Sequence, residues 1–251
     1  MSRTAVYTAL ILRNRPSGES NSEITILTAE EGIIKATVFG GAKSKLRSHS
    51  APYNSGKVWI YHDPSKDYRK VSDFDIHTWR AGLRELYERT MTAGSIADTI
   101  LSTHGGGGGW KTALELTVSA LDALENAGEE LCSRLLVHFL WRWTGFLGIQ
   151  PHLENCAVCG KAAEGSLLLF NIKDGQAACL GCTANESHQI NSSTFLKLNP
   201  GCRRWLSAIE QIEPSQLHRY SMDNKSFNEA KTLVTAILSE ALGKRLASWD
   251  W

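Results

Sequence analysis

The sequence lacks the local signatures of the common enzyme classes. Its 251 residues contain no Gly-x-Ser-x-Gly nucleophile elbow, no His-Glu-x-x-His metal motif, no P-loop and no glycine fingerprint for dinucleotides. Each of these motifs places a nucleophile, a metal ion or a phosphate-binding backbone where the reaction needs it. Their absence disfavours hydrolases, metalloproteases, nucleotide hydrolases and dehydrogenases, and it predicts a protein that is not an enzyme.

Long apolar runs are missing as well. No stretch of about 18 apolar residues is present that could span a membrane, and the N-terminus lacks the apolar segment of a signal peptide. We therefore expect a cytoplasmic protein with no membrane partner. Disulfides are rare in that compartment, so pairs of cysteines need another explanation.

The chain as a whole has almost no excess of charge, but its charges are unevenly distributed. The net charge is +1 overall, whereas residues 1–70 alone carry +5. No acidic residue occurs from Gly32 to His62. This asymmetry indicates that the N-terminal part contacts a polyanion such as nucleic acid.

Two Cys-x-x-Cys pairs dominate the rest of the sequence. Cys156 with Cys159 and Cys179 with Cys182 are separated by about twenty residues, which is the spacing of a four-thiolate zinc site. Four sulfur ligands close the coordination sphere and leave no position for a water molecule. The pattern therefore predicts one structural Zn²⁺ rather than a hydrolytic centre.

Other interpretations of the cysteines are weaker. Two disulfides are the main alternative, and a thioredoxin-like redox motif would need only one pair. His152 and Glu154 form the His-x-Glu of a zinc deaminase, but no proline directly precedes either cysteine pair, so we reject that class. Gly160 and Gly181 lie beside the pairs and are expected to have the unusual backbone angles of tight knuckles. Cys132 lies in an apolar stripe and is expected to be a buried thiol.

Residues 1–78 predict a small all-β domain. Five short runs rich in β-forming residues alternate with turn-forming residues, and they lie at 4–12, 24–27, 33–39, 57–61 and 68–76. So many short strands in fewer than about 80 residues indicate a barrel or a sandwich, with an OB-type barrel among the candidates.

From residue 79 the apolar spacing becomes helical, which makes the expected fold class α+β. We assign residues 79–150 and 188–251 to a helical domain and residues 151–187 to an inserted zinc module. Thr112 with Glu115 and Ser226 with Glu229 match the capping-box pattern and predict two helix N-termini. The run Gly105–Gly109 predicts a flexible loop, for which the sequence suggests no function.

Strand alternation predicts a binding surface on the barrel. In the third and fourth runs, alternate aliphatic residues are expected to face the core: Ile34, Ala36, Val38, Val58 and Ile60. The opposite face and the basic segment between the runs supply the candidate DNA-binding residues: Lys35, Lys43, Lys45, Arg47, Lys57 and Trp59. Cations neutralise phosphates, and aromatic rings stack on unpaired bases. A merely solvated basic loop, and aromatic rings that pack against the helical domain, remain the alternatives.

Several short segments, in a fixed order along the chain, point to one family. They are residues 9–12, Gly18-Glu19-Ser20, residues 26–28, Glu31-Gly32, residues 39–44 (Phe-Gly-Gly-Ala-Lys-Ser), residues 145–160, Phe170, Asp174-Gly175 and residues 179–182. Together they resemble the bacterial recombination mediator family RecO over essentially the full length. No single segment is decisive, and the combination is what is specific.

The resemblance implies an N-terminal OB-fold, a helical domain and a zinc-finger insertion. It implies a nucleoid-associated DNA repair protein that binds single- and double-stranded DNA and anneals complementary strands. It also implies that the protein acts with RecR to load the recombinase RecA onto DNA coated by single-strand binding protein (SSB). The acidic C-terminal tail of SSB would bind the helical domain, where Arg142, Arg203 and Arg204 are candidate contacts. An RNA-binding or transcription-associated module with a zinc ribbon and an OB-type barrel remains the alternative.

Overall fold

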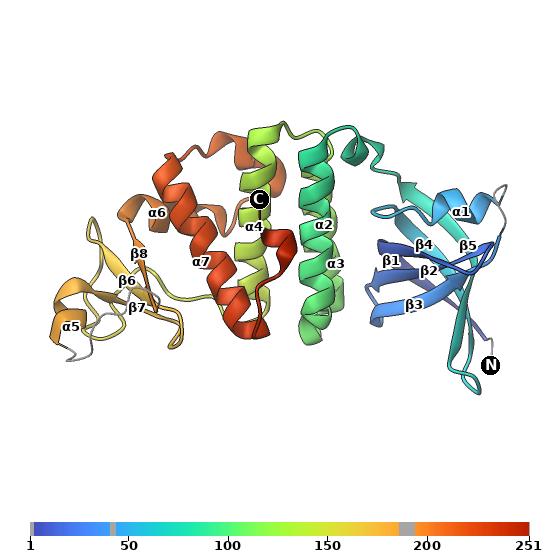
Figure 1. The fold of residues 1–251 in the computed structure, drawn as a ribbon, viewed down its shortest axis with the longest axis horizontal. Coiled ribbons are helices and arrows are strands. Elements are labelled where there is room, and N and C mark those ends of the chain that lie inside the picture. The colour runs from blue at the N-terminus through green and yellow to red at the C-terminus, as the bar shows by residue number, and fades with distance from the viewer. Residues whose placement is uncertain (1–2, 41–43, 186–193, 251) are drawn as a thin grey trace. The chain divides into compact units, whose positions relative to one another are not determined.

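The computed structural model describes residues 3–40, 44–185 and 194–250 and divides into two compact units, Met1–Ala127 and Gly128–Trp251 (Figure 1). The first unit combines a β-barrel with the helices α2 (Tyr87–Ser102) and α3 (Trp110–Leu124). The second unit combines the helices α4 (Glu129–Phe146), α6 (Pro200–Ile209) and α7 (Asn224–Leu242) with a small sheet. Within the described ranges, no helix has the length and apolar character needed to cross a membrane.

The barrel has the five strands that the sequence predicts. They are β1 (Thr4–Ser17), β2 (Asn21–Thr28), β3 (Gly32–Val38), β4 (Ser55–Asp63) and β5 (Tyr68–Thr78). The strands form a closed barrel in the order β1-β2-β3-β5-β4. Closure occurs where β3 meets β5 in parallel, with Thr37 opposite Lys70. A short helix, α1 (Lys45–His49), connects β3 to β4. This architecture confirms the expected OB-like barrel and excludes the sandwich.

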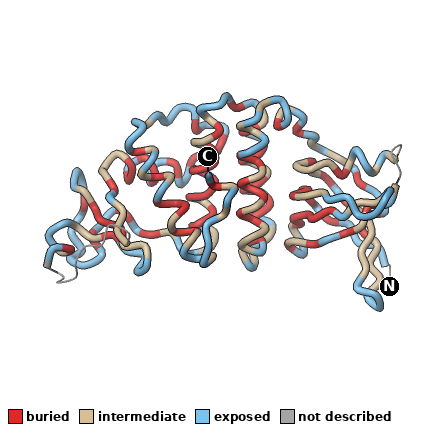
Figure 2. The backbone as a smooth tube through the Cα atoms, viewed as in Figure 1, coloured by how far each residue is buried: buried red, intermediate tan, exposed pale blue. Residues whose placement is uncertain are grey.

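The barrel core contains the residues that strand alternation assigned to it. Ile34, Ala36 and Val38 on β3 are buried together with Val58 and Ile60 on β4. Figure 2 shows buried residues along the barrel strands and along the helices. The alternate positions of the same strands point away from this core.

Arg80 fixes the chain where it leaves the barrel. Its side chain is fully buried, and its Nε donates to a carboxylate oxygen of Asp122 on α3 at 2.7 Å. Its Nη1 donates to the carbonyl oxygen of Tyr53 at 2.7 Å and to the hydroxyl of Ser55 at 3.0 Å. Since a buried charge needs such partners, this cation ties α3 to the start of β4.

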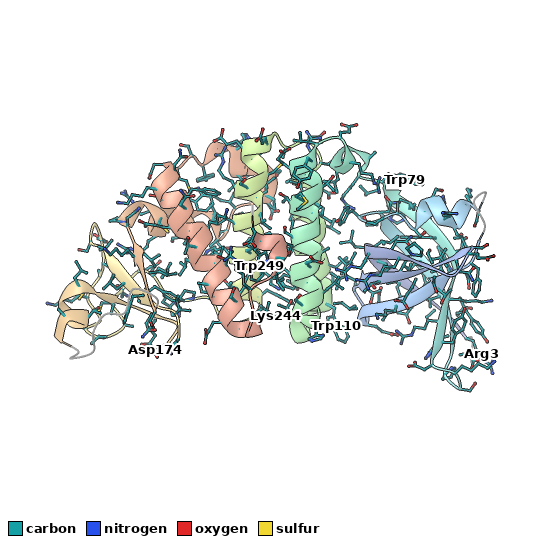
Figure 3. All side chains as sticks on the ribbon, viewed as in Figure 1. Arg3, Trp79, Trp110, Asp174, Lys244 and Trp249 are labelled. Atoms are coloured by element: carbon teal, nitrogen blue, oxygen red, sulfur yellow. The ribbon has the colours of Figure 1, made fainter. Side chains whose placement is uncertain are left out.

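The pentaglycine segment between α2 and α3 packs against the barrel. All five residues of Gly105–Gly109 have positive φ, and Gly105 is buried near Ile33 and Leu27. At the end of this segment the Trp110 ring, labelled in Figure 3, lies against Gly32. A Cβ added to Gly32 would lie only 2.7 Å from that ring. The segment therefore provides a left-handed turn that lets a tryptophan contact the β2–β3 turn.

The second unit contains a sheet that the sequence did not reveal. Strands β6 (Leu168–Asn171), β7 (Gln176–Cys179) and β8 (Phe195–Leu198) pair antiparallel in the order β7-β6-β8, and α5 (Leu180–Asn185) follows β7. Helices α4 and α7 pack together, and Phe139 stacks on Trp143 along α4. Cys132 is buried in α4, as predicted.

Both capping-box predictions were wrong about the residue that caps the helix. Helix α3 begins after Gly109, two residues before Thr112, and no side chain caps it. Helix α7 is capped by Asp223, whose carboxylate accepts from the Ser226 amide at 2.9 Å. In α7, Asp223 lies three residues before Ser226 and accepts from the Ser226 amide, which the Glu229 side chain would use in a capping box. In α3, tertiary contacts determine where the helix begins.

Candidate metal centre and nucleic-acid interface

Four cysteine side chains converge in the second unit. Cys156 and Cys159 lie in the loop between α4 and β6, Cys179 ends β7, and Cys182 lies in α5. Their Sγ atoms all lie within 4.8 Å of one another. None of the four forms a disulfide. This donor set can hold one metal ion.

Local hydrogen bonds build the first knuckle. The Cys156 amide donates to the carbonyl oxygen of Lys161 at 2.9 Å, and the Gly160 amide donates to the carbonyl oxygen of Cys156 at 2.9 Å. Gly160 has a φ of +69°, as expected for a tight turn. The same expectation was wrong for Gly181, which lies in α5 and has no positive φ. The two pairs are thus held differently, one by a turn and one by the join between a strand and a helix.

The four thiols perturb one another's protonation. Burial alone raises the pKa of Cys156, but hydrogen bonds from the amides of Cys179, Cys159 and Val158 outweigh it and bring the pKa to about 6. Hydrogen bonds with the thiols of Cys179 and Cys159 raise the pKa of Cys182 to about 12. One thiolate therefore forms readily and the last one does not. A bound cation would stabilise the full set of thiolates, which suits this donor set to a metal ion.

Arg203 joins the cysteine-bearing loop between α4 and β6 to helix α6. Its side chain is buried, and its Nη1 donates to the carbonyl oxygen of Leu153 at 2.9 Å. Its Nη2 donates to the carbonyl oxygens of Ala163 and Ser166. These carbonyls flank the first knuckle in the sequence. The guanidinium is thus engaged within the fold, whereas its neighbour Arg204 is exposed.

The structure distributes the predicted DNA-binding residues over separate parts of the barrel. Lys45 and Arg47 are exposed on α1, where the sequence indicated a loop, and Lys43 lies outside the described residues. Lys35 is exposed on β3, with its Nζ 3.8 Å from a carboxylate oxygen of Glu23. Strands β3 and β4 are not neighbours, because β5 lies between them.

The two predicted residues on β4 also have acidic neighbours. On β4, Lys57 lies opposite Asp75 of β5, and Trp59 lies opposite Asp73. Trp59 is only partly exposed. Asp73 and Asp75 follow the interval Gly32–His62 that lacks acidic residues. Only the pairing of β4 with β5 shows that they lie beside Lys57 and Trp59. They reduce the positive potential around Lys57 and Trp59.

Cations and aromatic rings do gather at the far end of β4 and β5. The Lys70 Nζ lies 5.3 Å from the centroid of the Tyr61 ring, and Arg3 donates to the Tyr61 hydroxyl at 3.1 Å. Phe39 and Tyr68 meet edge to face, with ring centroids 6.5 Å apart. We call these five residues the hairpin cluster, and Figure 3 shows Arg3 beside the β4–β5 hairpin.

Family models match almost the whole chain. The model described as "Recombination protein O N terminal" matches residues 1–79, and the model described as "Recombination protein O C terminal" matches residues 84–250. The chain belongs to the RecO family. The resemblance of its short segments is thereby confirmed.

Curated relatives of the RecO family align over nearly the full length. A DNA repair protein RecO of Desulforamulus reducens is 22% identical over 245 residues, covering 97% of this chain and 91% of that protein. A DNA repair protein RecO of Anaeromyxobacter dehalogenans is 26% identical over 251 residues, covering 97% of this chain and 94% of that protein. One of Desulfitobacterium hafniense is 25% identical over 257 residues, covering 96% and 86%.

Sequence reasoning on this RecO-family chain missed Arg3, Tyr68 and Lys70. Tyr68 and Lys70 are two residues apart in the fifth β run, and this alternation was the available signal. It did not show that Tyr61 lies opposite Lys70 or that Phe39 reaches Tyr68. Those contacts depend on the strand order.

Proposed function

We propose that this RecO-family protein binds single- and double-stranded DNA through its barrel and anneals complementary strands in the bacterial cytoplasm. The observation that best supports the proposal is the OB-like barrel with exposed cations on α1. Lys45 and Arg47 have no ion-pair partner among the described residues, so they are free to contact phosphates. Family membership and the relatives' shared name, DNA repair protein, support the same conclusion.

The proposed mechanism requires no catalytic group. Cations on the barrel neutralise phosphates, which reduces the repulsion between two strands and lets them approach. Binding releases condensed counterions, so affinity should decrease steeply as salt increases. Contacts to phosphate do not depend on the base sequence of the DNA. Annealing of arbitrary complementary strands requires this kind of contact.

We propose that the four-cysteine centre binds one structural Zn²⁺. With a Zn–S distance of about 2.3 Å, the edges of a sulfur tetrahedron measure roughly 3.8 Å, which is compatible with sulfur atoms within 4.8 Å of one another. Four thiolates leave no open position, so the ion would stabilise the loop and sheet rather than activate water. Cys156, Cys159, Cys179 and Cys182 would be its ligands.

We further propose that the protein acts with RecR and the C-terminal tail of SSB to load recombinase onto SSB-coated DNA. Family membership supports these partners. With Arg203 engaged by three carbonyl groups, the exposed Arg204 is the better candidate contact for an acidic tail.

Annealing of complementary DNA strands, followed by fluorescence over a salt series with and without SSB, tests this function. We expect salt-sensitive annealing that persists on SSB-coated strands. If the protein does not anneal DNA and binds RNA instead, the recombination-mediator function is wrong and the RNA-binding alternative replaces it.

A further inference from the structure

We propose that the hairpin cluster is a stacking platform for the unpaired bases of single-stranded DNA. The inference rests on the proposed function and extends it, because it separates a surface that contacts bases from the cations of α1 that contact phosphates. The cluster consists of Arg3, Phe39, Tyr61, Tyr68 and Lys70.

The strand register places one cationic and aromatic row across the barrel. Thr37 of β3 lies opposite Lys70 of β5, and Lys70 lies opposite Tyr61 of β4. The Lys70 ammonium lies over the Tyr61 ring, and Arg3 holds the Tyr61 hydroxyl from the other side. Lys70 thus covers one face of the Tyr61 ring, and both cations are placed to hold the phosphates of a nucleotide whose base stacks elsewhere in the cluster.

Phe39 is the apolar part of the platform. It follows β3 directly, and 47% of its surface is exposed. Its ring partner is Tyr68, at an interplanar angle of 61°. An edge-to-face contact leaves a ring face available to a flat ligand. Phe39 therefore packs on the barrel itself and still offers aromatic surface to a base.

The local charge also favours a nucleic acid. Asp63 lies opposite Tyr68, and its carboxylate accepts a hydrogen bond from the Ser65 hydroxyl at 2.7 Å. With Asp67 the hairpin has two acidic residues, against the four cations Arg3, Lys66, Arg69 and Lys70. The contrast is with Trp59, an aromatic residue whose cross-strand neighbour is Asp73. Of these two aromatic positions, the hairpin cluster is the one in which a cation is recorded over a ring.

The test compares two labelled 15-nucleotide strands with the same phosphates, one of thymidines and one abasic. Wild-type protein is expected to bind the thymidine strand roughly 10-fold more tightly than the abasic strand, since a base stacked on an aromatic ring adds about this much. Phe39→Ala and Phe39→Leu should remove most of this difference without changing affinity for the abasic strand. Phe39→Trp should restore it.

The control is Tyr87→Ala, which removes an aromatic ring on α2 that is 71% exposed and distant in sequence from the cluster. It should leave both affinities unchanged. If wild-type protein binds both strands equally, or if Phe39→Leu lowers both affinities alike, the platform is wrong while DNA binding stands. If wild-type protein binds neither strand, the proposed function fails and the platform fails with it.

Discussion

The cysteine centre and the barrel surface present two different ways of building a site. All four cysteines lie between residues 156 and 182, and their sulfur atoms come together through a turn, a strand end and a short helix. The hairpin cluster takes its residues from the N-terminus, the end of β3, β4 and β5. The first site depends on local spacing and the second on strand order. A site of the first kind can be recognised in a sequence, whereas one of the second kind needs the fold.

The two sites should also respond differently to mutation. Metal binding and folding are coupled in a cysteine centre, so loss of one ligand should disturb the whole loop and sheet. Cations and rings on a barrel surface contribute separately, and each substitution should alter binding by a small step while the fold stays intact.

The largest effect is expected at the cysteine centre. Cys179→Ser should release the metal and unfold the loop and small sheet, because apparent metal-binding free energies of such sites are about 10 kcal/mol or more. Metal content by mass spectrometry and proteolysis of residues 151–185 measure both effects. Cys202→Ala is the matched control, since Cys202 is buried in α6 and lies outside the cluster. One bound metal ion per Cys179→Ser protein would contradict the four-ligand centre.

The next effect sharpens the comparison by testing how the loop that carries Cys156 and Cys159 is attached to α6. Arg203→Met should destabilise the second unit by about 3 kcal/mol, because it leaves the buried carbonyl groups of Leu153 and Ala163, and the partly buried one of Ser166, without their donor. Denaturant unfolding measures the loss. The neighbouring Arg204→Met removes the same group from an exposed position and should change stability by less than about 0.5 kcal/mol. Equal losses in the two variants would show that Arg203 does not hold the loop.

An effect of similar size tests the contact between the barrel and α3. Gly32→Ala should cost about 3 kcal/mol, because the added methyl group meets Trp110 and the residue has a φ of +72°. Gly18→Ala provides the control, since Gly18 has a φ of +73° and nothing within 4 Å of an added Cβ. It should cost only about 1 kcal/mol, so the difference between the two variants isolates the clash. If the two thermal shifts are equal, Trp110 does not restrict this position.

The smallest effect is expected on the basic surface and leaves stability unchanged. Lys45→Ala combined with Arg47→Ala should reduce the slope of log affinity against log salt by about 1.8, or roughly 0.9 for each phosphate that the protein no longer neutralises. Adding Lys43→Ala tests the third cation of this segment. Lys57→Ala should change the slope less, because Asp75 lies opposite it. An unchanged slope in the combined variant would remove α1 from the interface.

The sequence predicted the barrel well and its surface less well. Alternation identified Ile34, Ala36 and Val38 as core residues because a residue's face depends only on its neighbours along the strand. It could not show that Asp73 and Asp75 lie opposite Trp59 and Lys57, because that register is set between strands.

At the cysteine centre and in the helices, too, the sequence did not show contacts between residues that are distant along the chain. The cysteine spacing predicted a four-sulfur cluster. No local sequence pattern, however, showed that Arg203 is buried and donates to three carbonyl groups. The pattern at Thr112 and Glu115 fits a capping box, yet α3 begins at Trp110, where the tryptophan packs against Gly32. Tertiary packing can override a local capping preference.

Closure of the barrel through Thr37 and Lys70 has a consequence for the order of events during folding. Hairpins such as β1–β2 and β4–β5 join residues that are close in sequence, whereas the β3–β5 pair joins distant ones and is therefore the slower to form. Phe39 and Tyr68 meet only once that pair has formed. A chain emerging from the ribosome would consequently present its basic residues before its paired Phe39 and Tyr68 rings, and discrimination of bases would appear last.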